Sequence, residues 1–166
     1  MQGSFIWYEL RSADKAAATA FYGAVVGWEA KPQGEPHGDY TIFSVPGFEM
    51  GVAGMMAINP DMACSGARPG WIGYIAANDV DATVAEIVAT GGRLLKGPED
   101  IPGGIGRFAV VNDPHGAVFC LFRPNMPEGP LPASAAPGSQ GTFGWRELYA
   151  GNREADFAFY SRLFGW

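Results

Sequence analysis

The chain has 166 residues, of which 48% are hydrophobic and 17% are charged, and its formal net charge is −6. This length supports one domain with a hydrophobic core. The acidic balance excludes a general nucleic-acid binder, which would carry a basic surface, and argues against docking on an anionic membrane. Two cysteines, Cys64 and Cys120, are too few for a disulfide framework, so we expect reduced thiols and a cytoplasmic protein. The sequence shows no signal-peptide pattern and no membrane span.

The first half of the chain predicts a strand, a helix and three further strands. In the strand at 5–11, alternation places Trp7 and Glu9 on one face and Tyr8 and Leu10 on the other. A helix over 15–26 follows, capped by Asp14 and ended by Gly27. We expect its alanine-rich stripe to pack on the Tyr8 face. That stripe comprises Ala17, Ala20, Phe21 and Ala24. The later strands are expected at 28–32, 40–45 and 49–56, and a loop at 59–70.

The second half predicts the same order of elements. The predicted elements are a strand at 71–76, a helix at 80–90 and strands at 93–96, 107–111 and 117–122. Residues 1–123 therefore predict one module of two βαβββ units. Residues 124–141 are rich in proline, glycine and alanine and predict a linker.

A repeat follows the linker. Residues 5–28 recur at 143–166, and ten of the 24 aligned positions are identical. Residues 142–166 therefore predict the first strand and helix of a second, incomplete module. Such a unit is stable only if another part of the protein packs on its apolar helix face and pairs with the edge of its strand. We expect a longer tandem protein, docking on the first module of the same molecule, or exchange between chains in a homodimer.

Several motifs carry a resemblance to a known family. Residues 21–28 read F-Y-G-x-x-x-G-W, and Asp113–Gly116 read D-P-x-G in the last turn. In this order the chain resembles the vicinal oxygen chelate superfamily of glyoxalases, extradiol dioxygenases and bleomycin resistance proteins, and in particular its tandem-module glyoxalase-like branch. The resemblance implies an α+β fold, in which two βαβββ units form one cupped eight-stranded mixed sheet with helices outside. It also implies a ligand cavity, often with a divalent metal.

Two of the positions where the family places metal ligands hold tryptophan in this chain. The resemblance puts them at Trp7, Trp71 and Cys120, with Glu49 the one candidate on the fourth strand. Indole rings offer no lone pair to a metal. We therefore expect no metal and no other cofactor at this site. The candidate donors are Glu9, Glu49 and Cys120.

We expect a cavity that binds a small molecule instead. Its predicted lining residues are Trp7, Glu9, Trp71, Cys120 and Phe122. Aromatic side chains commonly line such pockets, although the two tryptophans also fit simple core filling. Glu9 is the candidate catalytic residue, as a general base, with pairing to Arg11 as its alternative. A buried structural thiol is the alternative for Cys120.

The sequence thus predicts a metal-independent small-molecule-binding protein. The alternatives are a metal-dependent glyoxalase-like lyase, isomerase or dioxygenase, and a structural half of a larger pseudo-symmetric protein. Whether the chain is an enzyme stays open at this point.

Overall fold

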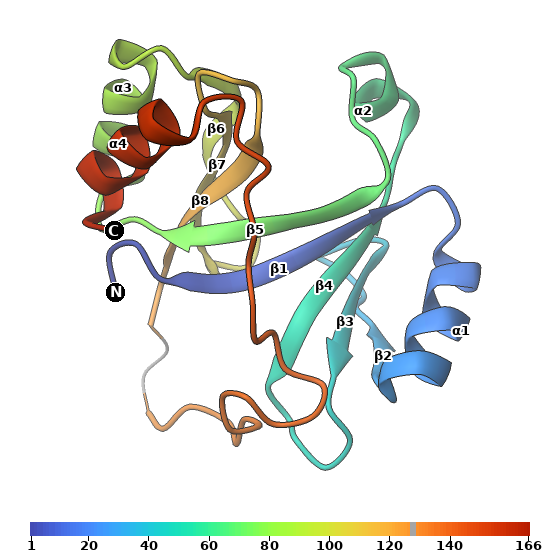
Figure 1. The fold of residues 1–166 in the computed structure, drawn as a ribbon. Helices are drawn as coiled ribbons and strands as arrows, with labels where there is room; N and C mark the ends of the chain where they lie inside the picture. Colours follow the sequence, from blue (N-terminus) through green and yellow to red (C-terminus); the bar gives the residue numbers. More distant parts are fainter. Residues whose placement is uncertain (127–128) are drawn as a thin grey trace. The chain divides into compact units, whose positions relative to one another are not determined.

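The chain forms one eight-stranded mixed sheet with helices outside in a computed structural model that describes residues 1–126 and 129–166 (Figure 1). The strand order is β2-β3-β4-β1-β5-β8-β7-β6. The elements are β1 Phe5–Ser12, α1 Lys15–Val26, β2 Glu29–Pro32, β3 Tyr40–Ser44, β4 Gly51–Ala57, α2 Pro60–Cys64, β5 Gly70–Ala76, α3 Val80–Ala89, β6 Arg93–Asp100, β7 Gly106–Asn112, β8 Val118–Pro124 and α4 Arg153–Phe164. The predicted α+β fold is confirmed. Within the described residues, no helix has the length and apolarity needed to cross a membrane.

The chain divides into two compact units. The α1 unit comprises Trp7–Ile72 and the described residues of Pro127–Trp145. The α3 unit comprises Met1–Ile6, Gly73–Met126 and Arg146–Trp166. Each unit therefore contains one of the first two long helices and part of the C-terminal region.

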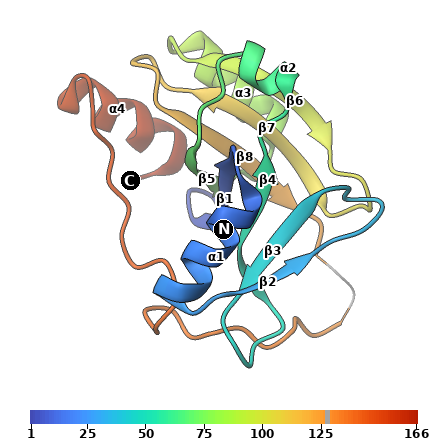
Figure 2. The ribbon, with the colours of Figure 1, turned by 90° about the vertical axis from the view of Figure 1, so that its right-hand side faces the viewer.

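In the α1 unit, β1 pairs with β4 in parallel, and β3 is antiparallel to both β4 and β2. Figure 2 shows α1 lying alongside β2 and β3. The helix begins at Asp14, whose side chain accepts from the Ala17 amide, and ends at Gly27 with φ +80°. The core of this unit comprises Leu10, Trp28, Phe43, Ala53 and Met55.

The face of α1 that packs on this core differs from the predicted one. Ala18, Tyr22 and Val26 lie against the core. The predicted stripe is exposed instead, namely Ala17, Ala20, Phe21 and Ala24. The cause is aromatic packing, because the Tyr22 ring stacks on Trp28 at 5.5 Å and thereby sets the rotation of the helix.

In the α3 unit, β5 pairs with β8 in parallel, and β7 is antiparallel to both β8 and β6. Asp79 caps α3, whose buried residues Val80, Val84 and Ile87 pack on the sheet. The C-terminal helix α4 packs against α3 in the same core. It contributes Phe159, Tyr160, Leu163 and Phe164. The predicted second copy of the repeat is therefore docked within its own chain through its helix.

The strand predicted for this second copy does not form. Residues 143–149, all of which the structure describes, contain no strand. In the first copy, β1 lies between β4 and β5 and pairs with both. A single strand without a hydrogen-bonded neighbour is unstable in water, so the equivalent segment stays extended without pairing.

The tryptophan that ends each copy of the repeat nevertheless makes the same contact, a hydrogen bond to the carbonyl of a glycine that lies just before the other copy. In the α1 unit, Trp28 Nε1 donates to the Gly141 carbonyl at 2.8 Å. In the α3 unit, Trp166 Nε1 donates to the Gly3 carbonyl at 2.9 Å. Both glycines have φ near +80°, which favours glycine at these two positions. Each copy therefore supplies the tryptophan for one contact, and the glycine two residues before each copy supplies the acceptor of the other.

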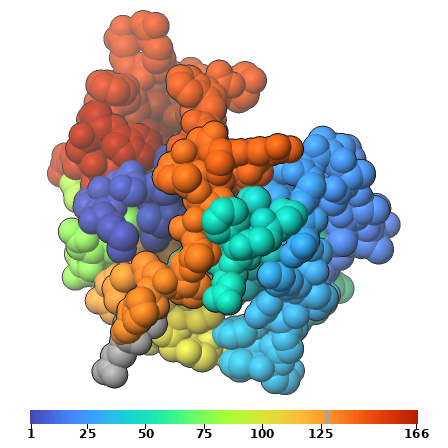
Figure 3. Space-filling model, turned by 90° about the horizontal axis from the view of Figure 1, so that it is seen from below, coloured from blue at the N-terminus to red at the C-terminus, as the bar shows by residue number. Residues whose placement is uncertain are grey.

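The segment before this copy also packs on the α1 unit. Figure 3 shows residues 129–145, in orange, against the turn between β3 and β4, in teal. The Met50 amide of that turn donates to the Ala133 carbonyl at 3.1 Å. Farther along the segment, the Phe143 ring stacks on Tyr8 with a centroid distance of 3.7 Å. The segment is thus held at two points.

Polar contacts tie α4 to the turn that follows β7. Tyr160 Oη donates to Asp113 Oδ2 at 3.0 Å, and His115 Nδ1 pairs with Asp156. Arg162 on the exposed side pairs with Glu86 of α3 at 2.8 Å. Burial, together with the nearby Asp113 carboxylate, raises the pKa of Tyr160 well above its usual value.

This raised pKa predicts a loss of stability at alkaline pH. Above about pH 10 the unfolded chain loses the phenol proton, whereas the folded chain keeps it, so the free energy of unfolding falls as pH rises. The decline is expected to be shallower in Tyr160→Phe, while the other five tyrosines are common to both proteins. Urea denaturation between pH 8 and 11 measures it. Parallel declines for the two proteins would contradict the assignment.

Candidate functional site

A cluster of polar and aromatic residues surrounds a buried carboxyl group on the inner face of the α1 unit, meaning the face of its sheet that α1 does not cover. Glu9 on β1 is only 5% exposed. Tyr40 Oη on β3 donates to Glu9 Oε2 at 3.2 Å, and Trp7 Nε1 donates to Tyr40 Oη at 3.0 Å. We call Trp7, Glu9, Arg11 and Tyr40 the Glu9 cluster. The predicted pairing of Trp7 and Glu9 on one face is observed.

Two glycines of β4 make room for the aromatic rings of this cluster. Gly54 lies opposite Glu9, and a Cβ atom there would be 1.8 Å from Tyr40 Oη. A Cβ atom at Gly51 would be 3.1 Å from the Trp7 ring. Glycine inside a strand often marks the close approach of another group. Sequence reasoning missed Tyr40, and the two glycines of the Gly51–Gly54 stretch were the available signal.

Arg11 provides the positive charge of the cluster. Its Nε atom lies 3.8 Å from Glu9 Oε1, so the predicted alternative of pairing between Glu9 and Arg11 is observed. This Nε atom is buried and has no hydrogen-bond partner in the structure. Glu9 therefore accepts a hydrogen bond from Tyr40 on one oxygen and faces a guanidinium on the other. Both oxygens of this buried carboxyl group therefore have a polar neighbour.

Trp71 lies on the opposite face from Trp7. Its Nε1 atom donates to Tyr22 Oη of α1 at 2.7 Å, and its ring contacts Trp28 and Phe143 edge-on. It belongs to the aromatic group between α1 and the sheet. The expectation that Trp7 and Trp71 line the same cavity is therefore corrected. Both faces of β5 are apolar in sequence, so alternation could not assign them.

In the α3 unit, Cys120 and Phe122 lie on the face opposite α3. Cys120 pairs with Tyr74 across the parallel β5–β8 ladder, and Phe122 pairs with Phe108 across β7–β8. The rings of Phe122 and Tyr74 are in edge contact at 6.1 Å. Cys120 is fully buried, which fits the alternative of a structural thiol. That these residues bind a ligand stays a prediction.

The donors available for a divalent metal do not fit one. The indole N–H groups of Trp7 and Trp71 are both committed as hydrogen-bond donors. Glu49 is exposed just before β4. Among the residues that the structure describes, no group of three or more His, Cys, Asp or Glu side chains could hold a metal ion. A divalent site needs such a set of oxygen, nitrogen or thiolate ligands. We therefore derive no chemical step through a metal.

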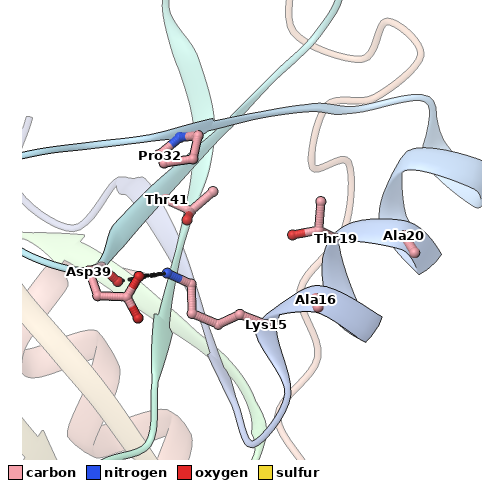
Figure 4. Close-up of a pocket in the computed structure, with 7 residues that line it drawn as sticks. All are labelled: Lys15, Ala16, Thr19, Ala20, Pro32, Asp39 and Thr41. Atoms are coloured by element: carbon pink, nitrogen blue, oxygen red, sulfur yellow. Dashed lines mark hydrogen bonds and ion pairs between the residues drawn. The ribbon is translucent and has the colours of Figure 1, made fainter.

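A surface groove of about 450 Å³ lies on the other side of the α1 unit (Figure 4). It lies between α1 and β2–β3, and Lys15 pairs with Asp39 at its edge. The remaining lining residues are Ala16, Thr19, Ala20, Pro32 and Thr41. No member of the Glu9 cluster lines it, and its one ion pair is internally satisfied. We therefore place the candidate site at the Glu9 cluster.

A family model described as a glyoxalase-like domain matches residues 7–122. Over 98% of its length, the chain is 32% identical to the anthracycline biosynthesis protein DauV of Streptomyces sp. strain C5, across 61% of that relative. Over 74% of its length it is 39% identical to CFP32 of Mycobacterium tuberculosis, which carries the name glyoxylase, across 44% of that relative. The chain thus spans about three-fifths of DauV and less than half of CFP32.

The Mn(II)-bound glyoxalase from Novosphingobium aromaticivorans shares the fold. The superposition has a TM-score of 0.64 and 16% identity, and it covers 99% of this chain and 52% of that chain. At this identity the likeness concerns the fold alone.

Proposed function

The chain belongs to the glyoxalase-like domain family of the vicinal oxygen chelate superfamily, and we propose that it binds a small organic molecule at the Glu9 cluster without a metal at the family position. The observation that carries this proposal is the buried carboxylate of Glu9, connected to Tyr40 and Arg11 on the inner face of the sheet. A buried carboxyl group with polar partners is costly to maintain, so it is a reasonable candidate for a functional group.

The cluster offers three kinds of contact to a ligand. Glu9 provides acceptor oxygens, Tyr40 a hydroxyl, and Trp7 an apolar ring surface, as expected of a pocket with few polar groups among aromatic ones. In a reaction, the Glu9 carboxylate would accept a proton from a ligand heteroatom next to it, which would keep the electron pair, and pairing with Arg11 would lower the basicity of Glu9. The same contacts serve binding without chemistry, so the proposal concerns the ligand site first.

The test begins with native mass spectrometry of the purified chain, which identifies any small molecule that it retains. Glu9→Gln keeps the shape and removes the charge, and it is expected to weaken binding of that molecule at least tenfold. Glu49→Gln changes an exposed carboxylate and is expected to leave affinity unchanged. Equal affinities for the two variants, measured by calorimetry, would place the ligand elsewhere.

A second candidate is the metal-dependent glyoxalase-like enzyme, which the name of CFP32 favours. Elemental analysis of the same preparation separates the two candidates. One equivalent of Mn, Zn, Ni or Fe, retained through dialysis and lost with activity on chelation, would favour the enzyme. The proposed metal-independent site expects no stoichiometric metal and unchanged ligand affinity in the presence of a chelator.

A further inference from the structure

The outer face of α1 is apolar and uncharged. Phe21 and Val25 on this face are 57% and 66% exposed. The single charged residue of the helix is Lys15, in its first turn. We define the α1 outer face by five of the six exposed residues of the helix, leaving out Ala16 in its first turn, and these are Ala17, Ala20, Phe21, Ala24 and Val25. A surface helix normally carries polar residues toward solvent, so an apolar stripe of this kind marks an interaction surface.

The second copy of the repeat shows what covers such a face. Phe159 and Leu163 of α4 are the counterparts of Phe21 and Val25, displaced by 138 residues. They are only 6% and 7% exposed, because α4 packs against α3 and both helices share one core cluster. The same face is therefore covered by a helix in one copy and bare in the other.

The two helices have matching backbone geometry at both caps. The N-caps Asp14 and Asn152 have φ of −139° and −140°, and the C-caps Gly27 and Gly165 have φ of +80° and +76°. The exchanged contacts of Trp28 and Trp166 follow at the same position after each helix. The helix α4 packs against α3, whereas Phe21 and Val25 on α1 are exposed.

We propose that the α1 outer face docks a helix of the α3 type that belongs to a second glyoxalase-like module. Its chemistry is that of α3, an amphipathic helix with Val80, Val84 and Ile87 along one side. The relative DauV is long enough to contain such a module, because about two-fifths of its sequence lies outside the match to this chain. A face of one short helix is far smaller than the ~800 Å² per partner of a stable complex, which favours a tethered module over a second free copy of this chain.

The test uses the 166-residue chain and a synthetic peptide of residues 78–92. A lactam between Asp81 and a lysine introduced by Ala85→Lys, both on the exposed side of α3, holds the peptide helical. Titration of the peptide into ¹⁵N-labelled chain is followed by NMR. The expected result is saturable shift changes at residues 17–25. In the Phe21→Glu variant the affinity is expected to fall at least tenfold.

Two controls make each outcome decisive. Val88→Glu in the chain changes an exposed apolar residue of α3 and is expected to leave the affinity unchanged. A peptide with Val84→Asp and Ile87→Asp is expected not to bind. Shifts that are absent at residues 17–25, or that persist in Phe21→Glu, overturn the proposal. So does a dimer of the chain that Phe21→Glu dissociates, since the occupant would then be a second copy.

Discussion

Phe164→Ala is expected to lower the free energy of unfolding by about 3–5 kcal/mol, the range for removal of a buried phenylalanine. Phe164 is the last residue of α4 and belongs to the core of the α3 unit. Its ring contacts Phe119, Tyr160 and Trp166, with centroid distances of 6.1, 6.3 and 5.3 Å. Truncation would leave a cavity among three aromatic rings that cannot readily close. Urea denaturation followed by circular dichroism measures the change.

The matched control is Phe157→Ala on the same helix. Phe157 is 65% exposed, so its truncation should change stability by less than about 0.5 kcal/mol. Both variants shorten the same kind of side chain in one helix, and they differ in burial alone. If Phe164→Ala lowered the free energy of unfolding as little as Phe157→Ala, α4 would contribute nothing to stability. The core of the α3 unit would then end at β8.

The C-terminal helix illustrates how far the repeat could be read from the sequence. Its identities to residues 5–28 predicted a helix, and α4 forms with the same kind of caps as α1. The predicted strand before it failed for a physical reason. A helix satisfies its own backbone hydrogen bonds, whereas a strand depends on neighbours that the local sequence does not specify. The identities between the two copies therefore predicted the helix correctly but not the strand.

The faces of elements were harder to predict than the elements themselves. In α1, the stripe through Phe21 and the stripe through Tyr22 are both apolar, so periodicity allowed two rotations of the helix. The stacking of Tyr22 on Trp28 decides between them. In β5, Trp71 posed the same ambiguity, and its hydrogen bond to Tyr22 Oη settles its face. Tertiary contacts between aromatic rings supplied the missing information in both cases.

The candidate site was predicted in part for a related reason. Trp7 and Glu9 are two residues apart in one strand, so alternation alone places them on one face. Tyr40 joins them from a strand that is not adjacent to β1 in the sheet, and it reaches Glu9 across Gly54 of the intervening β4. This contact depends on strand order, which a single sequence with short strands did not provide.

Asp113→Ala is expected to cost about 3 kcal/mol or more of folding free energy. Asp113 is almost fully buried in the turn between β7 and β8. Its Oδ1 atom accepts from the amides of His115 and Ala117 at 2.9 and 2.8 Å, and its Oδ2 atom accepts from Tyr160 Oη at 3.0 Å. Alanine would leave three donors without their acceptor; an unsatisfied buried group such as the Tyr160 hydroxyl costs about 1–3 kcal/mol, and the two part-buried amides add to this loss. Thermal and urea denaturation at neutral pH measure the loss.

A double-mutant cycle with Tyr160→Phe separates the turn from the contact with α4. Tyr160→Phe removes one donor and leaves Oδ2 of Asp113 without its partner, while the two amide contacts of Asp113 remain. If the phenol–carboxylate bond ties α4 to this turn, the double variant should lose less stability than the sum of the two single losses. The expected coupling is about 1.5–3 kcal/mol, as for a hydrogen bond to a charged group. Strict additivity would mean that Asp113 stabilises the turn alone and that α4 is held by its apolar face.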